Sequence, residues 1–143
     1  MNEFLRLPAH ERALVVQAAA LSVMFRLALW IAPFSRVRRL TARLGRGRAR
    51  HPHESARIGW AVEGVGRRLP WVDCLPQALA AFVLLSRSGY TASVRVGVAR
   101  TERFAAHAWV EANGVAVVGG AEKARFTEAT GADLIAARAE RWG

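Results

Sequence analysis

The chain has 143 residues, a formal net charge of +10 and 52% hydrophobic residues. This length fits one domain, and the apolar content is sufficient for a core, which excludes a wholly disordered protein. The single cysteine excludes an intramolecular disulfide and suits a reducing compartment. Because the N-terminus also lacks the layout of a signal peptide, we expect a cytoplasmic protein.

The N-terminal part predicts one long helix. No glycine or proline interrupts the sequence from Ala9 to about Trp30, and Pro33 is expected to end the helix. Arg26 lies inside this apolar run, where a charge in the middle of a membrane span would cost about 2.5–3.5 kcal/mol. We therefore expect a helix buried against the domain or a partner, and we do not expect membrane association.

An arginine-rich stretch follows, over residues 36–50. Gly45 and Gly47 lie inside it and favour a solvated linker over a firm helix. The alternative is a patch for a polyanion or an acidic partner. No aromatic residue is interleaved with the arginines, so a stacking platform is missing and we expect no nucleic-acid partner.

Two further helices are predicted, from Ser55 to about Arg68 and from Cys74 to about Ser86. The second is apolar on nearly all sides, which is typical of a central, buried helix. Gly89 is a suitable C-terminal cap.

The pattern then changes to strands. Valines alternate in 92–99, Phe104 to Ala112 forms the next strand, and Asn113-Gly114 is a strong hairpin signal before the returning strand Val115–Val118. A last helix is expected from about Thr130 to Trp142. Helices followed by an antiparallel meander predict an α+β fold, not alternating βαβ units.

Cys74 lies where an irregular segment enters the central helix. Asp73 is expected to cap that helix by accepting a hydrogen bond from a first-turn N–H group. The free N–H groups and the helix dipole favour an anion at this end, such as a thiolate. The competing interpretation is a small buried hydrophobic residue, which is a common role for an isolated cysteine.

His107 supplies a candidate base for this thiol. It lies on the second strand and shares one face with Trp109 and Glu111, because alternate residues of a strand point the same way. A cysteine at a helix start and a histidine on a following strand are the pair that a thiol protease needs. A hydrogen-bonded structural histidine is the alternative.

These motifs, in this order and spacing, resemble the transglutaminase-like leader peptidases of lasso peptide biosynthesis, the B proteins or their C-terminal halves. The resemblance covers about residues 58–120 and rests on the following segments: Asp73-Cys74-Leu75, Ala78-Leu79, Gly89, Val96-Gly97-Val98, and Phe104 to Glu111 with Gly114.

The resemblance implies a papain-like or transglutaminase-like fold and a cysteine peptidase that cuts a ribosomally made precursor between leader and core. Cys74 would be the nucleophile and His107 the general base, and the backbone N–H of Cys74 would belong to the oxyanion hole. This chemistry requires no metal and no cofactor.

At the third catalytic position the sequence departs from the family pattern, which usually has an Asp shortly after the hairpin. If Ala112 pairs with Val115, then Gly120 lies opposite His107, and glycine has no side chain to orient the imidazole. Glu111 and Glu122 are the candidates that remain, beside a backbone carbonyl or a water molecule.

We expect one compact domain with a helical, basic N-terminal region (1–57) and a peptidase core (58–143). No strand-rich segment in 1–57 resembles the leader-binding domain of fused family members. The resemblance thus implies a split system, with a separate leader-binding protein, a lasso cyclase and the precursor peptide as partners. The apolar face of the first helix would offer a docking surface for the leader-binding protein or for the cyclase.

Two other functions remain open. One is an acyltransferase or deamidase on the same Cys–His pair, because thiol chemistry alone does not select water as the acceptor. The other is a non-catalytic basic binding protein, for nucleic acid or a membrane, in which Cys74 is merely buried.

Overall fold

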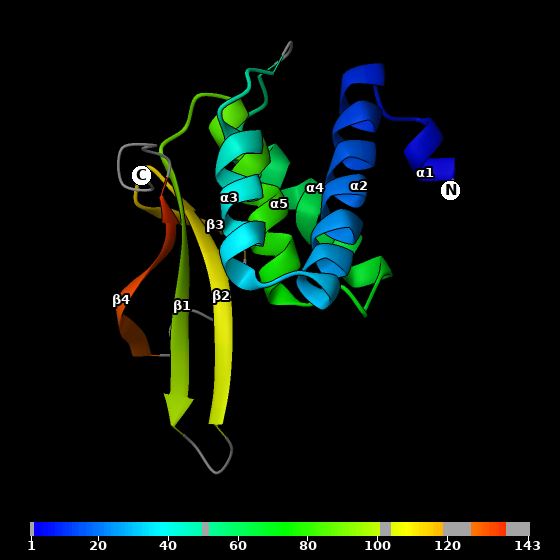
Figure 1. Cartoon of the computed structure of the whole chain (residues 1–143). Coiled ribbons are helices and arrows are strands. Elements are labelled where there is room, and N and C mark those ends of the chain that lie inside the picture. Colours follow the sequence, from blue (N-terminus) through cyan, green and yellow to red (C-terminus); the bar gives the residue numbers. More distant parts are fainter. Residues whose placement is uncertain (1, 50–51, 101–103, 119–126, 137–143) are drawn as a thin grey trace.

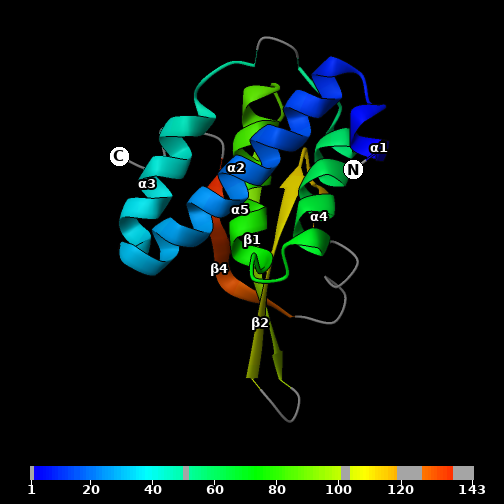
Figure 2. The same ribbon diagram turned by 90° about the vertical axis from the view of Figure 1, so that its right-hand side faces the viewer.

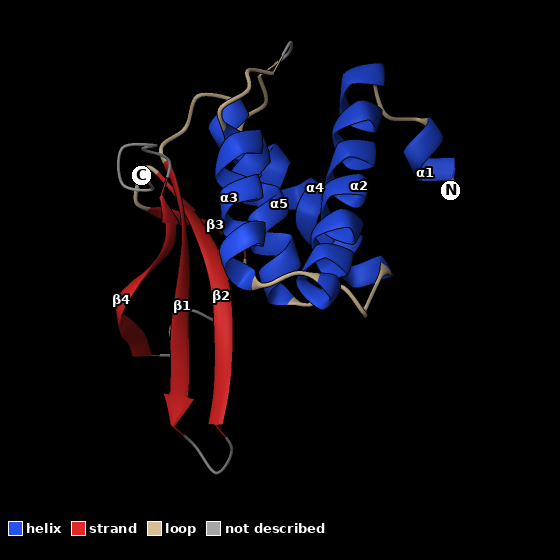
Figure 3. Cartoon of the chain, in the orientation of Figure 1, coloured by secondary structure: helices blue, strands red, loops and turns tan. Residues whose placement is uncertain are grey.

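The computed structural model describes residues 2–49, 52–100, 104–118 and 127–136. A helical layer packs on one side of an antiparallel sheet, which confirms the predicted α+β class (Figure 1, Figure 3). The strand order is β3-β2-β1-β4. The elements are α1 (Asn2–Leu5), α2 (Ala9–Ile31), α3 (Phe34–Gly45), α4 (Ser55–Arg68), α5 (Cys74–Arg87), β1 (Ala92–Arg100), β2 (Phe104–Ala112), β3 (Val115–Val118) and β4 (Thr127–Ala136).

Helix α5 lies at the centre of the molecule, as its apolar surface predicts. The helices α2, α3 and α4 pack around it, and its remaining side faces β1 and β2 (Figure 2). Every residue of 78–85 is buried, and these side chains form the middle of the core. The observed start at Cys74 and end at Arg87 confirm the predicted helix.

Helix α2 confirms the first predicted helix and ends just before Pro33. One stripe of it is buried, through Leu14, Ala18 and Phe25. Its outer face is apolar but exposed. Among the described helices, α2 alone is long and apolar enough to cross a membrane, a property that core helices of soluble proteins share.

The predicted linker over 36–50 is wrong in its first part, because α3 extends to Gly45. Val37 and Thr41 are buried against α5, and the Thr41 hydroxyl donates to the Val37 carbonyl at 2.7 Å. A Cβ atom on Gly45 would lie only 3.2 Å from the Phe82 ring. The glycine therefore permits close helix packing here, and this tertiary contact overrides its weak helix propensity.

The hairpin forms as predicted. Asn113 and Gly114 both have positive φ, at 51° and 85°, which is the backbone of a type I′ turn. Asn113 also closes the loop to Thr91: its N–H donates to the Thr91 carbonyl at 2.8 Å, and its Oδ1 accepts from the Thr91 N–H at 3.1 Å.

The predicted C-terminal helix is wrong over its described part. Thr127–Ala136 forms β4, which pairs antiparallel with β1 and contains two register shifts. Pairing with β4 gives hydrogen-bond partners to the backbone N–H and C=O groups along the edge of β1. The free energy of this long-range pairing outweighs the local helix-like spacing of the alanines. The rest of that predicted helix, 137–142, lies outside the described residues.

Candidate active site

The segment before Cys74 gives the site its geometry. Asp73 is the N-cap residue of α5 and has extended backbone angles, but its side chain makes no capping hydrogen bond. The predicted cap is therefore wrong. An N-cap side chain bonds the N–H of the second or third helical residue, and the third residue here is Pro76, which has no N–H. The Asp73 carboxylate instead lies 3.8 Å from Nε of Arg26 on α2.

Cys74 is the first residue of α5, and its side chain is half-buried. Its sulfur accepts a hydrogen bond from the backbone N–H of Ala108 on β2, with an N···S distance of 3.5 Å. This N–H belongs to the peptide group that follows His107, so the sulfur lies within about 6.5 Å of the His107 Cα atom. The structure thus brings the two predicted catalytic positions together. The side chain of His107 lies outside its described part.

The two faces of β2 have different roles. Ala108, Val110 and Ala112 are buried in the core that the strand shares with the helices. Trp109 and Glu111 occupy the other face, as strand alternation predicts, and both are buried.

Glu111 has specific partners on that face. Its Oε2 accepts a hydrogen bond from the Trp109 indole Nε1 at 2.9 Å and lies 3.9 Å from Nε of Arg95. The carboxylate therefore holds an indole and a guanidinium in place. Its role as a third catalytic member remains a prediction.

The register of β3 follows the prediction only at its start. Ala112–Val115 and Glu111–Ala116 pair as expected, but a bulge then makes Val110 pair with Val118. The predicted pairing of His107 with Gly120 therefore does not follow from the observed register. Gly120 itself and the other candidate third member, Glu122, lie outside the described residues.

The start of α5 has hydrogen-bond donors to offer an anion. The first-turn N–H groups of a helix have no intrahelical partner, and here they belong to Cys74 and Leu75, since Pro76 has none. The first intrahelical bond runs from the Gln77 N–H to the Asp73 carbonyl at 3.4 Å. The thiol thus lies at the positive end of the helix dipole, which stabilises negative charge. Among the described residues, no group of three or more His, Cys, Asp or Glu could hold a metal ion.

Two residues that the sequence reasoning did not assign support this site. Arg26 Nε donates to the Trp71 carbonyl at 3.0 Å, and Gln77 Nε2 donates to the Val72 carbonyl at 2.9 Å. Together they fix the turn that leads into Cys74. The only signal for Arg26 in the sequence is a charge isolated within an apolar helix.

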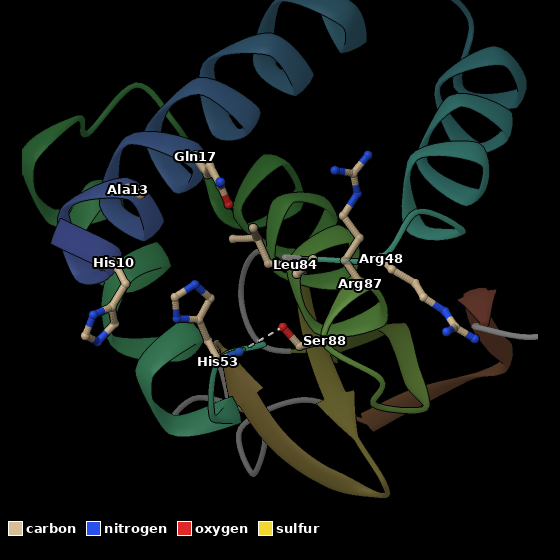
Figure 4. A pocket seen from close by; sticks show the side chains of 9 residues that line it. His10, Ala13, Gln17, Arg48, His53, Leu84, Arg87 and Ser88 are labelled. Atoms are coloured by element: carbon tan, nitrogen blue, oxygen red, sulfur yellow. Dashed lines mark hydrogen bonds between the residues drawn. The ribbon is translucent and has the colours of Figure 1, made fainter. Parts of the chain in front are cut away.

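A separate cavity of about 340 Å³ lies near the opposite end of α5 (Figure 4). The rings of His10 and His53 stack there with centroids 6.3 Å apart. In Figure 4 the side chain of Arg87 extends away from this pair, and its Nε donates to the Leu44 carbonyl at 2.7 Å. Because α5 separates this cavity from Cys74 by about 15 Å or more, it is not part of the candidate active site.

Comparison with known families gives one match. A model described as the transglutaminase-like superfamily matches residues 19–130. The chain belongs to the transglutaminase-like superfamily. Its members are typically cysteine-based peptidases or transferases. The matched segment contains both Cys74 and His107 and begins inside α2, so part of the helical layer belongs to the superfamily domain. No curated protein and no solved structure matches the chain.

Proposed function

We propose that this transglutaminase-like protein is a cysteine peptidase that removes the leader from a lasso peptide precursor. The observation that carries a thiol-based activity is the position of the Cys74 sulfur, at the start of α5 and 3.5 Å from the amide nitrogen that follows His107. The superfamily match supports cysteine chemistry. The narrower substrate class rests on the motif resemblance around Cys74 and along β2.

The proposed reaction has two steps. The imidazole of His107 takes the Cys74 proton, and the thiolate attacks the carbonyl carbon at the leader–core junction. The backbone N–H of Cys74 stabilises the oxyanion, and the imidazolium returns its proton to the leaving amine of the core peptide. Water, deprotonated by the same imidazole, then hydrolyses the thioester, which releases the leader and restores the thiol.

We also propose that the peptidase acts in the cytoplasm with a separate leader-binding protein and a lasso cyclase. The exposed apolar face of α2 suits docking of the leader-binding protein, since exposed apolar patches often mark protein interfaces. Its most exposed side chains are Trp30 and Ile31, at 77% and 76%. The exposed arginines of α3 carry no neighbouring acid on that helix and would attract acidic residues of the leader or of the partner.

The test is cleavage of the precursor, followed by mass spectrometry, with and without the leader-binding protein. We expect Cys74→Ala and His107→Ala each to lower kcat by roughly 10⁴-fold or more, because nucleophile and base act as a unit. His53→Ala is the matched control, since His53 lies by the distant cavity, and it should cleave normally. Cleavage by either catalytic variant at the wild-type rate would contradict the assignment. Efficient cleavage without the leader-binding protein would contradict the split arrangement.

An acyltransferase or deamidase is the second candidate, because the superfamily includes transferases as well as peptidases. Adding a primary amine to the assay separates the two, since an acyltransferase would join the amine to the acyl group in preference to water. A dominant amine adduct would replace the peptidase proposal. A Cys74 that resists alkylation would favour a non-catalytic binding protein.

A further inference from the structure

Arg26 is the only charged residue between Arg12 and Arg36, and it lies in an apolar part of α2. Its side chain is 39% exposed and has two partners, the Trp71 carbonyl at 3.0 Å and the Asp73 carboxylate at 3.8 Å. Both partners belong to the segment that leads directly into Cys74, so one guanidinium from α2 contacts two of the three residues before the nucleophile.

The orientation of Asp73 matters for that nucleophile. As the N-cap residue, Asp73 would ordinarily accept a hydrogen bond from the Leu75 N–H, because Pro76 offers none. A carboxylate in that position would bring negative charge to the positive end of α5, beside the Cys74 sulfur. The structure shows no such capping bond, and the carboxylate lies toward Arg26 instead.

We propose that Arg26 is a positioning residue that holds the Asp73 carboxylate away from the first turn of α5. The first-turn N–H groups then remain available to the thiolate and to the oxyanion. This inference rests on the proposed function, because it defines the role of Arg26 relative to Cys74 as the nucleophile. It also explains why a guanidinium occupies an otherwise apolar stretch of α2.

The experiment measures the rate at which iodoacetamide alkylates Cys74 at pH 7, which needs neither precursor nor partner. The proteins are the wild type, Arg26→Met, Arg26→Lys, Asp73→Ala and the double variant Arg26→Met/Asp73→Ala. We expect Arg26→Met to react about two- to fivefold more slowly, the range that a partly exposed ion pair allows. Arg26→Lys should recover part of the rate, because it keeps a positive charge near Asp73.

The double variant decides the mechanism. Removal of the carboxylate leaves nothing to cap the helix, so we expect Asp73→Ala and the double variant to react at about the wild-type rate. A role in folding alone would leave the double variant as slow as Arg26→Met, and that result would overturn the inference. A wild-type rate for Arg26→Met would overturn it as well.

Circular dichroism checks that each variant is folded. If Arg26→Met does not fold, Arg26→Gln replaces it in the series. The same series in the cleavage assay should show the loss mainly in kcat and not in KM, because Arg26 acts on the reacting end of α5 and not on substrate binding. An inert Cys74 in the wild type would contradict the proposed function together with this inference. A reactive Cys74 that is insensitive to Arg26 would contradict the inference alone.

Discussion

At the scale of single residues, the site depends on polar groups whose partners come from distant parts of the chain. Asp73 contacts Arg26, and the Cys74 sulfur accepts from the Ala108 amide. Each of these pairs joins residues more than thirty positions apart in the sequence. The surroundings of the thiol at the start of α5 thus depend on a guanidinium from α2 and a backbone N–H group from β2.

Glu111 gives a prediction at this scale. It is 7% exposed and accepts the Trp109 indole hydrogen at 2.9 Å. Glu111→Ala removes this acceptor from the interior, and we expect it to lower the free energy of unfolding by about 1–3 kcal/mol. Glu111→Gln keeps an acceptor oxygen of similar shape and should cost less. Urea denaturation of both variants measures the difference.

The same pair of variants examines the catalytic role predicted for Glu111. If the carboxylate orients His107, Glu111→Gln should lower kcat for precursor cleavage while the protein remains folded. Full activity in Glu111→Gln would leave the residue with its packing role on β2 and would remove it from the list of third members.

At the scale of elements, α4 and β3 meet through a glycine. An added Cβ on Gly59 would lie 2.8 Å from the backbone oxygen of Val117, which is too close. Val117 is also the residue that the register skips at the bulge between β2 and β3. The close approach of helix and strand therefore depends on Gly59, at the point where the strand departs from regular pairing.

This contact makes Gly59→Ala informative. Alanine favours a helix over glycine by about 1 kcal/mol, but the clash with backbone should outweigh that gain, since overpacking typically costs about 1–3 kcal/mol. Gly64→Ala, on the same helix, is the control, because its nearest neighbour would be the flexible Arg67 side chain at 3.7 Å. Thermal unfolding should show a lower Tm for Gly59→Ala and an unchanged or higher Tm for Gly64→Ala. Equal effects would contradict the packing explanation.

At the scale of the whole molecule, α2 has two apolar faces with different roles. Its inner stripe belongs to the core, and its outer face lies on the surface of the helical layer (Figure 2). A helix that is apolar on all sides is normally covered on all sides. Among the described residues, this exposed face is the surface that we propose for the leader-binding protein, and the net charge of +10 would favour an acidic partner.

The two faces respond differently to substitution. The double variant Trp30→Ser/Ile31→Ser should change the free energy of unfolding by about 0.5 kcal/mol or less, because both side chains are largely exposed. Phe25→Ala, on the buried stripe, should cost about 3–5 kcal/mol. Binding of the leader-binding protein, measured by calorimetry, should be lost in the serine variant. If the serine variant still binds the leader-binding protein, the docking surface lies elsewhere. If the wild type binds lipid vesicles and the serine variant does not, a membrane is the occupant of this face.

The sequence by itself determined the elements whose signals are local. The helices α2, α4 and α5, the strands β1 to β3 and the Asn113-Gly114 turn all follow from apolar spacing and turn chemistry, which act over a few residues. The choice of Cys74 and His107 as catalytic candidates came from residue type and motif, and the structure places the Cys74 sulfur beside the backbone amide that follows His107.

Only the tertiary structure decided the features that depend on distant partners. The helix α3 forms because Val37, Thr41 and Gly45 pack on α5, although its glycine predicts a linker. The strand β4 forms because β1 offers an edge to pair with. Asp73 makes no capping hydrogen bond to α5, and its carboxylate instead lies near Arg26 on the distant helix α2. For α3 and β4, the free energy of the long-range contacts exceeds the roughly 1 kcal/mol of a local preference, and a local pattern contains no information about such contacts.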